Sequence, residues 1–131
     1  MIVKDIMSSS VISVMPNDNL DKVIFIMKSE DVGIVPVCDK QNHLLGIITD
    51  RDIVIRYKED LLSKDIMTRT PITVSSNEGI HDAALKFSKY KVRRLPVLDG
   101  ERLVGMLSLR DMAKKKVLTV EIGHIIYNIC N

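Results

Sequence analysis

Gly46-Ile47-Ile48-Thr49-Asp50-Arg51-Asp52 occurs a second time in this chain, as Gly105-Met106-Leu107-Ser108-Leu109-Arg110-Asp111. Each copy reads glycine, two apolar residues, a small hydroxyl residue, one variable residue, arginine and aspartate. The apolar pair is typical of the end of a buried strand. A hydroxyl followed three residues later by a carboxylate predicts the capping box that begins a helix. Because such a motif is common in proteins that bind nothing, its repetition carries the argument.

The surroundings of the motif repeat as well. Val3-Lys4-Asp5-Ile6-Met7 returns 60 residues later as Ser63-Lys64-Asp65-Ile66-Met67. The spacing is still 60 at Asp39 and Asp99, and it is 59 at the two motif glycines. The difference falls in turn sequences, where a change of length costs little. We therefore expect one repeat at 1–60, a second at 61–116, and an apolar tail at 117–131.

Each repeat predicts the element order β-α-β-β-α. Short alternations at 12–14 and 72–74 predict strands, and prolines in the runs 34–37 and 95–98 favour a strand start or edge. The strands before the two motifs are expected at 44–48 and 103–107. Helical spacing predicts buried faces at Leu20, Val23, Ile24 and Met27, and at Ile80, Ala83, Ala84 and Phe87. Sixty residues bury little surface, so we expect an α/β (α+β) fold in which both repeats pack about a pseudo-twofold axis.

Composition excludes several functions. The balance of 19 Lys and Arg against 17 Asp and Glu, with 4% aromatics and no Trp, argues against bulk nucleic-acid binding. Neither the two cysteines nor the three histidines have metal-ligand spacing, and Cys38 is expected to be a buried thiol. No nucleophile–base set is present, so we predict no enzyme. The start of the chain and its short apolar runs predict neither a signal peptide nor a membrane span, hence a cytoplasmic protein.

The motif residues suit a nucleotide, although structural readings remain open. A helix start exposes N–H groups to a phosphate, and the aspartate could accept two hydrogen bonds from a ribose diol. Arg51 and Arg110 could bind phosphate or be solvated. Arg93 and Arg94 could bind phosphate or protect a strand edge from aggregation. The apolar tail could pack on its own domain or on a partner subunit.

The duplicated set of Lys-Asp-Ile-Met, apolar-Pro-Val and Gly-apolar-apolar-Thr/Ser-x-Arg-Asp resembles a tandem pair of CBS domains, named after cystathionine β-synthase. The resemblance covers residues 1 to about 116. It implies a regulatory homodimer that acts on a separate effector protein. It also implies a cleft between the repeats that binds an adenosyl ligand: AMP, ADP or ATP ahead of S-adenosylmethionine or NAD. No catalytic cofactor is expected.

The resemblance assigns site residues to both repeats. Ribose and phosphate would lie at Thr49 with Asp52 and at Ser108 with Asp111, and the adenine neighbours would be Ser10, Ile12, Gly33 and Ile34 in the first set and Thr70, Ile72, Arg93 and Arg94 in the second. Arg51 and Arg110 join the two sets as the phosphate candidates named above. Because only the second set has an arginine pair, we expect one tight nucleotide per chain, in the cleft of Ser108 and Asp111, and a weak second one. The alternative is a ligand-free dimeric scaffold or a nucleic-acid adaptor.

Overall fold

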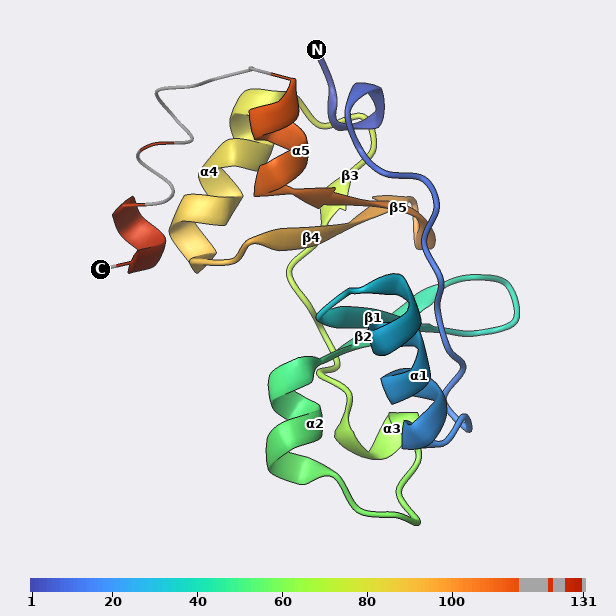
Figure 1. Cartoon of the computed structure of the whole chain (residues 1–131). Coiled ribbons are helices and arrows are strands. Elements are labelled where there is room, and N and C mark those ends of the chain that lie inside the picture. Colours follow the sequence, from blue (N-terminus) through green and yellow to red (C-terminus); the bar gives the residue numbers. More distant parts are fainter. Residues whose placement is uncertain (116–122, 124–126, 131) are drawn as a thin grey trace. The chain divides into compact units, whose positions relative to one another are not determined.

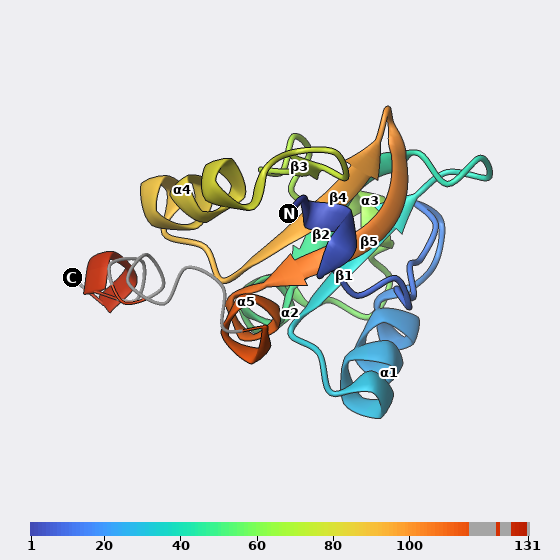
Figure 2. The ribbon, with the colours of Figure 1, turned by 90° about the horizontal axis from the view of Figure 1, so that it is seen from above.

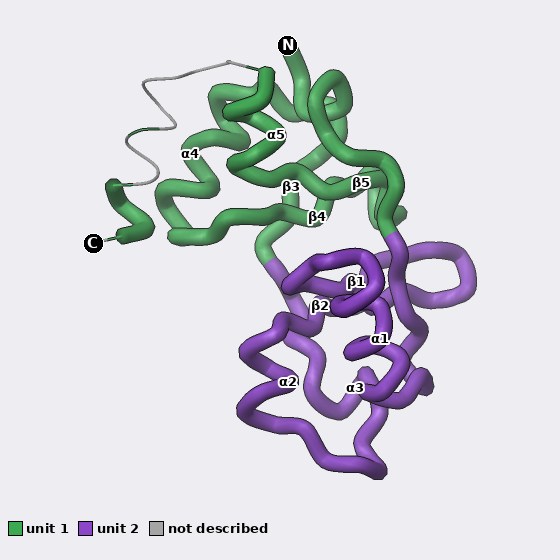
Figure 3. The backbone as a smooth tube through the Cα atoms, viewed as in Figure 1, with its two compact units in different colours: residues 1–11, 72–131 green, residues 12–71 purple. Residues whose placement is uncertain are grey.

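The computed structural model describes residues 1–115, 123 and 127–130, and it divides into two compact units (Figures 1 and 3). Unit 1 comprises residues 1–11 and 72–131, and unit 2 comprises residues 12–71. The units are not the sequence repeats, because the lead segment of each repeat (1–11 or 61–71) lies in the unit of the other. The repeat boundaries at 60 and 116 stay a prediction about the duplication, and packing follows a different division.

Unit 2 contains a two-stranded sheet with helices around it. Its strands β1 and β2 are antiparallel, and Val14 adds a single parallel bridge to Val37 where the sequence predicted a strand at 12–14. The turn between the strands is held by the Asp39 carboxylate, which accepts the amides of Gln41 and His43. The elements are α1 (Leu20–Glu30), β1 (Ile34–Cys38), β2 (Leu44–Thr49), α2 (Asp50–Arg56) and α3 (Ser63–Ile66).

Unit 1 repeats this plan with a three-stranded sheet in the order β3-β4-β5, in which β3 and β4 are parallel and β4 and β5 antiparallel. Strand β5 runs directly into α5 (Figure 2). The predicted mixed α+β class is confirmed, and the predicted element order holds except at 12–14, where the expected strand is the single Val14 bridge. The elements are the 3-10 turn η1 (Val3–Asp5), β3 (Val74–Ser75), α4 (Ile80–Tyr90), β4 (Arg94–Asp99), β5 (Arg102–Ser108) and α5 (Leu109–Lys114).

The proline expectation is wrong for unit 1. Pro96 lies inside β4, the middle strand of the sheet. Strand β3 pairs only with Val97 and Leu98, beyond the proline. The missing N–H therefore removes no bond to β3, which is how a central strand tolerates this residue.

The cores follow the predicted helix faces with one shift. All four predicted residues of α4 are buried, and Phe87 packs with Leu107 and Met112 so that α4 and α5 cover the same sheet. In α1, Leu20 and Val23 are buried as predicted, but Ile26 is buried whereas Ile24 and Met27 are only half-buried. The buried stripe of α1 is therefore rotated from the prediction toward Ile26. Cys38 is a buried free thiol, as predicted.

The tail contacts unit 1 where it is described. Ile129 packs against the core of this unit, and the Asn128 amide donates a hydrogen bond to the Ser88 hydroxyl on α4. These contacts favour packing on the chain's own unit. The other apolar tail residues lie outside the described residues: Val117, Leu118, Val120, Ile122, Ile125 and Ile126.

Each lead segment is bound into the unit of the other repeat by backbone pairing and by apolar packing. Thr68 exchanges two hydrogen bonds with Ile47, at 2.8 and 3.0 Å, and Ser8 exchanges two with Met106, both 2.9 Å. Val3 and Ile6 belong to the core of unit 1, and Ile66 and Met67 to that of unit 2. The lead segment 1–11 is therefore part of the core of unit 1, and the lead segment 61–71 is part of the core of unit 2.

The two motif glycines lie where the lead segments pass closest to strands β2 and β5. A Cβ on Gly46 would stand 2.6 Å from the Thr68 carbonyl oxygen, and one on Gly105 would stand 2.7 Å from that of Ser8. Methionine sulfur atoms of the lead segments lie at 2.9 and 2.6 Å from the same two Cβ positions. Glycine is required here by space, because a methyl group would meet the backbone of the crossing segment.

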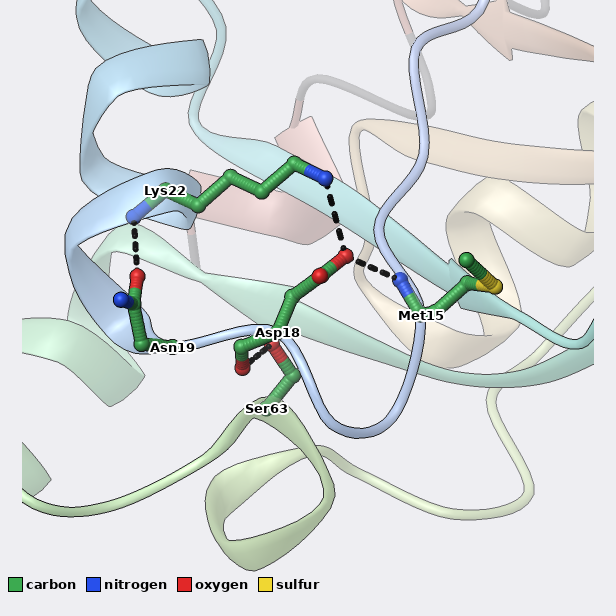
Figure 4. Close-up of polar contacts among 5 residues, drawn as sticks. All are labelled: Met15, Asp18, Asn19, Lys22 and Ser63. Atoms are coloured by element: carbon green, nitrogen blue, oxygen red, sulfur yellow. Dashed lines mark hydrogen bonds and ion pairs between the residues drawn. The ribbon is translucent and has the colours of Figure 1, made fainter.

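The loop before α1 receives the lead segment in unit 2 (Figure 4). The Asp18 carbonyl accepts the amide and the hydroxyl of Ser63, at 2.8 and 2.9 Å. The Asp18 carboxylate accepts the Met15 amide at 2.7 Å and the Lys22 ammonium at 3.1 Å, while Asn19 caps α1 through the Lys22 amide. The Met15 hydrogen bond, aided by Lys22, lowers the pKa of Asp18. The charged carboxylate thus shapes the loop that holds α3.

We predict that Gly46→Ala and Gly105→Ala each lower the free energy of unfolding by about 1–3 kcal/mol, because the added methyl overpacks the crossing. Denaturant unfolding measures this. Gly79→Ala is the matched control, since its Cβ would have only the Asp82 carboxylate at 3.8 Å, and it should cost less than about 1 kcal/mol. Wild-type stability in both motif variants would contradict the close crossing.

The Asp18 carboxylate should also make stability depend on pH. Its folded pKa is lowered, so its contribution is present above the unfolded value of about 3.9 and is lost as pH falls through the folded value. Unfolding measured between about pH 2 and pH 7 should therefore show a shallower acid loss in Asp18→Asn, together with lower stability at neutral pH. Glu30→Gln is the control, an exposed carboxylate for which the described residues supply no hydrogen bond. An acid profile that Asp18→Asn leaves unchanged would refute this role.

Candidate functional site

The two motif copies form the same capping box in their separate units. In unit 2 the Asp52 amide donates to Thr49 Oγ1 at 3.2 Å, and Asp52 Oδ2 accepts the Thr49 amide at 2.9 Å and its hydroxyl at 3.0 Å. In unit 1 the Asp111 amide donates to Ser108 Oγ at 3.0 Å, and Asp111 Oδ2 accepts the Ser108 amide at 2.9 Å. The predicted cap geometry is confirmed in both copies.

The cap uses only part of each carboxylate. The bonds above engage Oδ2 of Asp52 and of Asp111, and both side chains are half-buried. Within the described residues no hydrogen bond engages Oδ1 of either carboxylate. An ionised carboxylate has about four acceptor positions, so each aspartate is held rigidly by one oxygen and presents the other to a donor.

The start of a neighbouring strand lies directly beside each box. Ile34 is the register partner of Thr49, and Arg94 is that of Ser108. Register partners project from the same face of the sheet, with Cβ atoms about 5 Å apart. The backbones are also joined, since the Asp50 amide donates to the Gly33 carbonyl at 2.9 Å and the Leu109 amide to the Arg93 carbonyl at 3.1 Å.

Most of the predicted site residues are therefore neighbours within a unit. Unit 2 brings together Gly33, Ile34, Thr49, Arg51 and Asp52. Unit 1 brings together the corresponding residues Arg93, Arg94, Ser108, Arg110 and Asp111.

The predicted adenine neighbours that precede the two helices α1 and α4 are divided between the two units. Ile12 leads into the Val14 bridge of unit 2 and is exposed, whereas Ile72 packs on the core of unit 1. Ser10 and Thr70 each fall in the opposite unit from the isoleucine two residues later, and both are exposed. Thr70 also has a φ of +67°, which a β-branched residue rarely adopts. The structure thus does not gather Ser10 and Thr70 with the other residues of their sets inside one unit.

The helix starts themselves contribute less than the sequence suggested. Helix α2 has 7 residues and α5 has 6, so few peptide dipoles are aligned. Arg51 and Arg110 are exposed, and so are Arg93 and Arg94.

Asp50 is a candidate site residue that the sequence reasoning missed. Its carboxylate lies against Gly33, such that a Cβ there would stand 3.0 Å from Asp50 Oδ2, and its Oδ1 accepts the Arg51 amide at 2.8 Å. The position is the variable one of the motif, and unit 1 has Leu109 there. The sequence held one signal for it: the first copy has Asp50 together with Gly33, whereas the second copy has Leu109 together with Arg93 at the same two positions.

Two α-β-β-α arrangements with a capping-box motif at each strand-to-helix junction define a duplicated-repeat protein. Residues 3–59 and 63–117 both match the family model described as the CBS domain. The chain belongs to the CBS-domain family and carries a tandem pair of CBS domains.

Known relatives match this chain over most of its length. The chain is 31% identical over 132 residues to the CBS domain-containing protein YhcV of Bacillus subtilis, across 97% of this chain and 94% of YhcV. Its fold is similar to that of CBSX2 in complex with AMP, with a TM-score of 0.81 and 26% identity over 88% of this chain and 95% of that one. It is also similar to the CBS domain pair of protein MJ0100 in complex with 5′-methylthioadenosine and S-adenosylmethionine, with a TM-score of 0.78 and 30% identity over 88% and 95%.

Two other kinds of site have no counterpart in the described part of the chain. Across residues 1–115, 123 and 127–130, no helix is long and apolar enough to cross a membrane. The same residues contain no group of three His, Cys, Asp or Glu side chains that could hold a metal ion. The cytoplasmic location and the absence of a metal stay predictions.

Proposed function

We propose that this protein is a regulatory module that binds an adenine nucleotide of the AMP, ADP or ATP class and transmits its presence to a separate effector protein. The observation that carries the proposal is the pairing of Arg94 with Ser108 beside the capping box of Asp111. Support comes from CBSX2, which was crystallised with AMP, and from MJ0100, which was crystallised with two adenosyl compounds.

Ribose recognition follows from the two aspartates. Oδ1 of Asp111 would accept hydrogen bonds from the ribose hydroxyls, while Oδ2 stays in the capping box. Because the box fixes the carboxylate before the ligand arrives, little side-chain freedom is lost on binding. Asp52 offers the same geometry in unit 2.

Phosphate recognition distinguishes the two copies. Arg93 and Arg94 stand at the start of β4, and Arg110 is in the first turn of α5. Guanidinium groups bind phosphate oxygens through paired N–H donors. The nucleotide phosphate is therefore assigned to the copy with Ser108 and Asp111.

The same groups suit binding rather than turnover. Both aspartates are tied to backbone amides and serve as acceptors, which is a positioning role and not that of a proton-transfer catalyst. We accordingly propose a protein without enzymatic activity.

We further propose a homodimer in which α2 contacts a second copy. None of the residues of α2 is buried, and Val54 and Ile55 are 83% and 69% exposed. Adjacent exposed aliphatic side chains of this kind are typical of an interface. The pairing into dimers implied by the family resemblance identifies a second copy of the chain as the occupant.

Arg94→Ala should weaken AMP binding about ten-fold or more and leave adenosine binding unchanged, because the lost contact is to phosphate. Titration calorimetry with both ligands measures this. Arg102→Ala is the matched control, an exposed arginine at the opposite end of strand β5 from Ser108. Equal losses for AMP and adenosine would contradict the phosphate assignment.

Asp111→Ala should abolish the tight binding of AMP in the same titration, while Asp52→Ala should retain it. The reverse result would assign the nucleotide to the other copy.

Light scattering of the wild type at micromolar concentration should give the mass of a dimer, and Val54→Glu should give a monomer, because a buried unpaired charge opposes association. Leu85→Glu is the comparison, an apolar position on α4 that is 66% exposed. A wild-type monomer, or dissociation by Leu85→Glu and not by Val54→Glu, would contradict the α2 interface.

A further inference from the structure

The C-terminal tail is bound to the last turns of α4. Residues 127–130 are helical, and the Asn128 amide donates a hydrogen bond to the Ser88 hydroxyl. Ile129 packs against the core of unit 1. Ser88 lies in the part of α4 that ends at Tyr90. One polar and one apolar contact therefore hold this short segment, and a contact of that size can open locally while the rest of the unit stays folded.

The same end of α4 leads directly into the arginine pair. The helix is closed by Lys91, whose left-handed φ of 53° turns the chain out of the helix while its amide donates to the Phe87 carbonyl. Val92 follows, and then come Arg93 and Arg94 at the start of β4. A shift of the last turn of α4 is therefore passed along the chain to the two guanidinium groups.

Apolar packing also connects the tail to the helix start of the candidate site. The side chains that are half-buried against the core of unit 1 include Ile129, Val92 and Leu109. Val92 precedes Arg93, Leu109 precedes Arg110, and the Leu109 amide donates to the Arg93 carbonyl at 3.1 Å. Because close-packed interiors transmit strain, Ile129 is linked through one core to the backbone that carries these arginines.

Unit 2 is arranged differently after its second helix. Tyr57, which follows α2, donates to the Asp21 carboxylate at 2.8 Å, and Asp21 lies in the first turn of α1. The position of α1 that aligns with Ser88 is Lys28, which is exposed. The tail thus contacts the end of a helix in the repeat that carries the arginine pair. This placement favours a role at that site over a general feature of the fold.

We propose that residues 127–130 form a strap on α4 that couples nucleotide binding at Asp111 to the position of the C-terminal tail. This inference rests on the proposed function, in which the arginine pair binds the phosphate. A bound nucleotide fixes the arginines and favours the docked strap, whereas an empty site favours its release. Because coupling between two sites is reciprocal, the docked strap raises nucleotide affinity by the same factor.

The strap also gives the effector something to recognise. Residues 117–126 of the tail are rich in Ile and Val, and an apolar segment of this kind suits contact with a partner protein. Release of the strap frees the tail for that contact. The tail is then the element through which the effector reads the nucleotide.

Titration calorimetry of full-length Ile129→Asp with AMP and adenosine tests the coupling. The new charge opposes docking of residue 129 on the apolar core. AMP affinity should fall about five-fold or more, the lower end of the usual range for coupling between sites. Adenosine affinity should stay at the wild-type value, because the coupling passes through the arginines that bind the phosphate.

Two serine variants complete the titrations. Ser88→Ala removes the acceptor for the Asn128 amide, so it should lower AMP affinity in the same direction. Ser29→Ala is the matched control, because this hydroxyl lies near the end of α1 and bonds within its own helix, to the Ile26 carbonyl. It should leave AMP affinity unchanged. Ser88→Ala keeps the test decisive if Ile129→Asp does not fold.

Cys130 gives a direct readout of the strap. Its thiol is exposed whereas that of Cys38 is buried, so a fluorophore can be attached selectively beside Ile129. Saturating AMP should raise the fluorescence anisotropy of this label, because the docked strap moves less. Adenosine should raise it less than AMP, and Asp111→Ala should abolish the response to AMP.

Three results would overturn the inference: wild-type AMP affinity in both Ile129→Asp and Ser88→Ala, equal losses for AMP and adenosine, or an anisotropy at Cys130 that AMP does not change. The proposed function survives all three, provided that the wild type binds AMP. A wild type that binds no AMP overturns both.

Discussion

The rest of the structure depends on the close crossing of each lead segment over a motif glycine. Beside Gly46 and Gly105 the backbone of the other repeat leaves no room for a methyl group, because a Cβ atom there would lie 2.6 or 2.7 Å from a carbonyl oxygen. Paired hydrogen bonds hold the crossing backbone in place. This contact brings Ile66 and Met67 into one core and Val3 and Ile6 into the other. Because each unit is completed by a segment of the other repeat, neither repeat contains a complete core by itself. The motif glycine is thus a packing residue, and the hydroxyl and aspartate that follow it form the capping box.

Much of this architecture could be read from the sequence, because local signals specify local structure. The capping boxes, the α4 face and the β-α-β-β-α order follow from periodicity and from residues that act within one helical turn. The crossing of the lead segments could not be read, since it is a non-local pairing that gives no periodic signal. The Pro96 position was misjudged for the same reason: whether a proline costs a bond depends on where its neighbouring strand begins.

For the candidate site, too, the sequence predicted the local contacts and missed the non-local ones. Thr49 with Asp52 and Ser108 with Asp111 are local pairs, and the sequence identified them correctly as caps. Asp50 was overlooked because its relevance comes from the space above Gly33, which only the fold reveals. The grouping of Ser10 and Thr70 with the other residues of their sets stays a prediction, because each set includes residues of both units. Duplication preserved the backbone contact between strand start and helix start, and divergence changed the charges displayed on it.

The central claim is that a charged nucleotide binds at Asp111 and is held by Arg93 and Arg94. A crystal structure of the wild-type protein with AMP tests it most directly. We expect the ribose hydroxyls on Asp111 Oδ1, with Oδ2 still accepting the Ser108 amide, and the phosphate on Arg93 and Arg94. A phosphate bound next to Asp50, or an AMP molecule that touches neither aspartate, would contradict it.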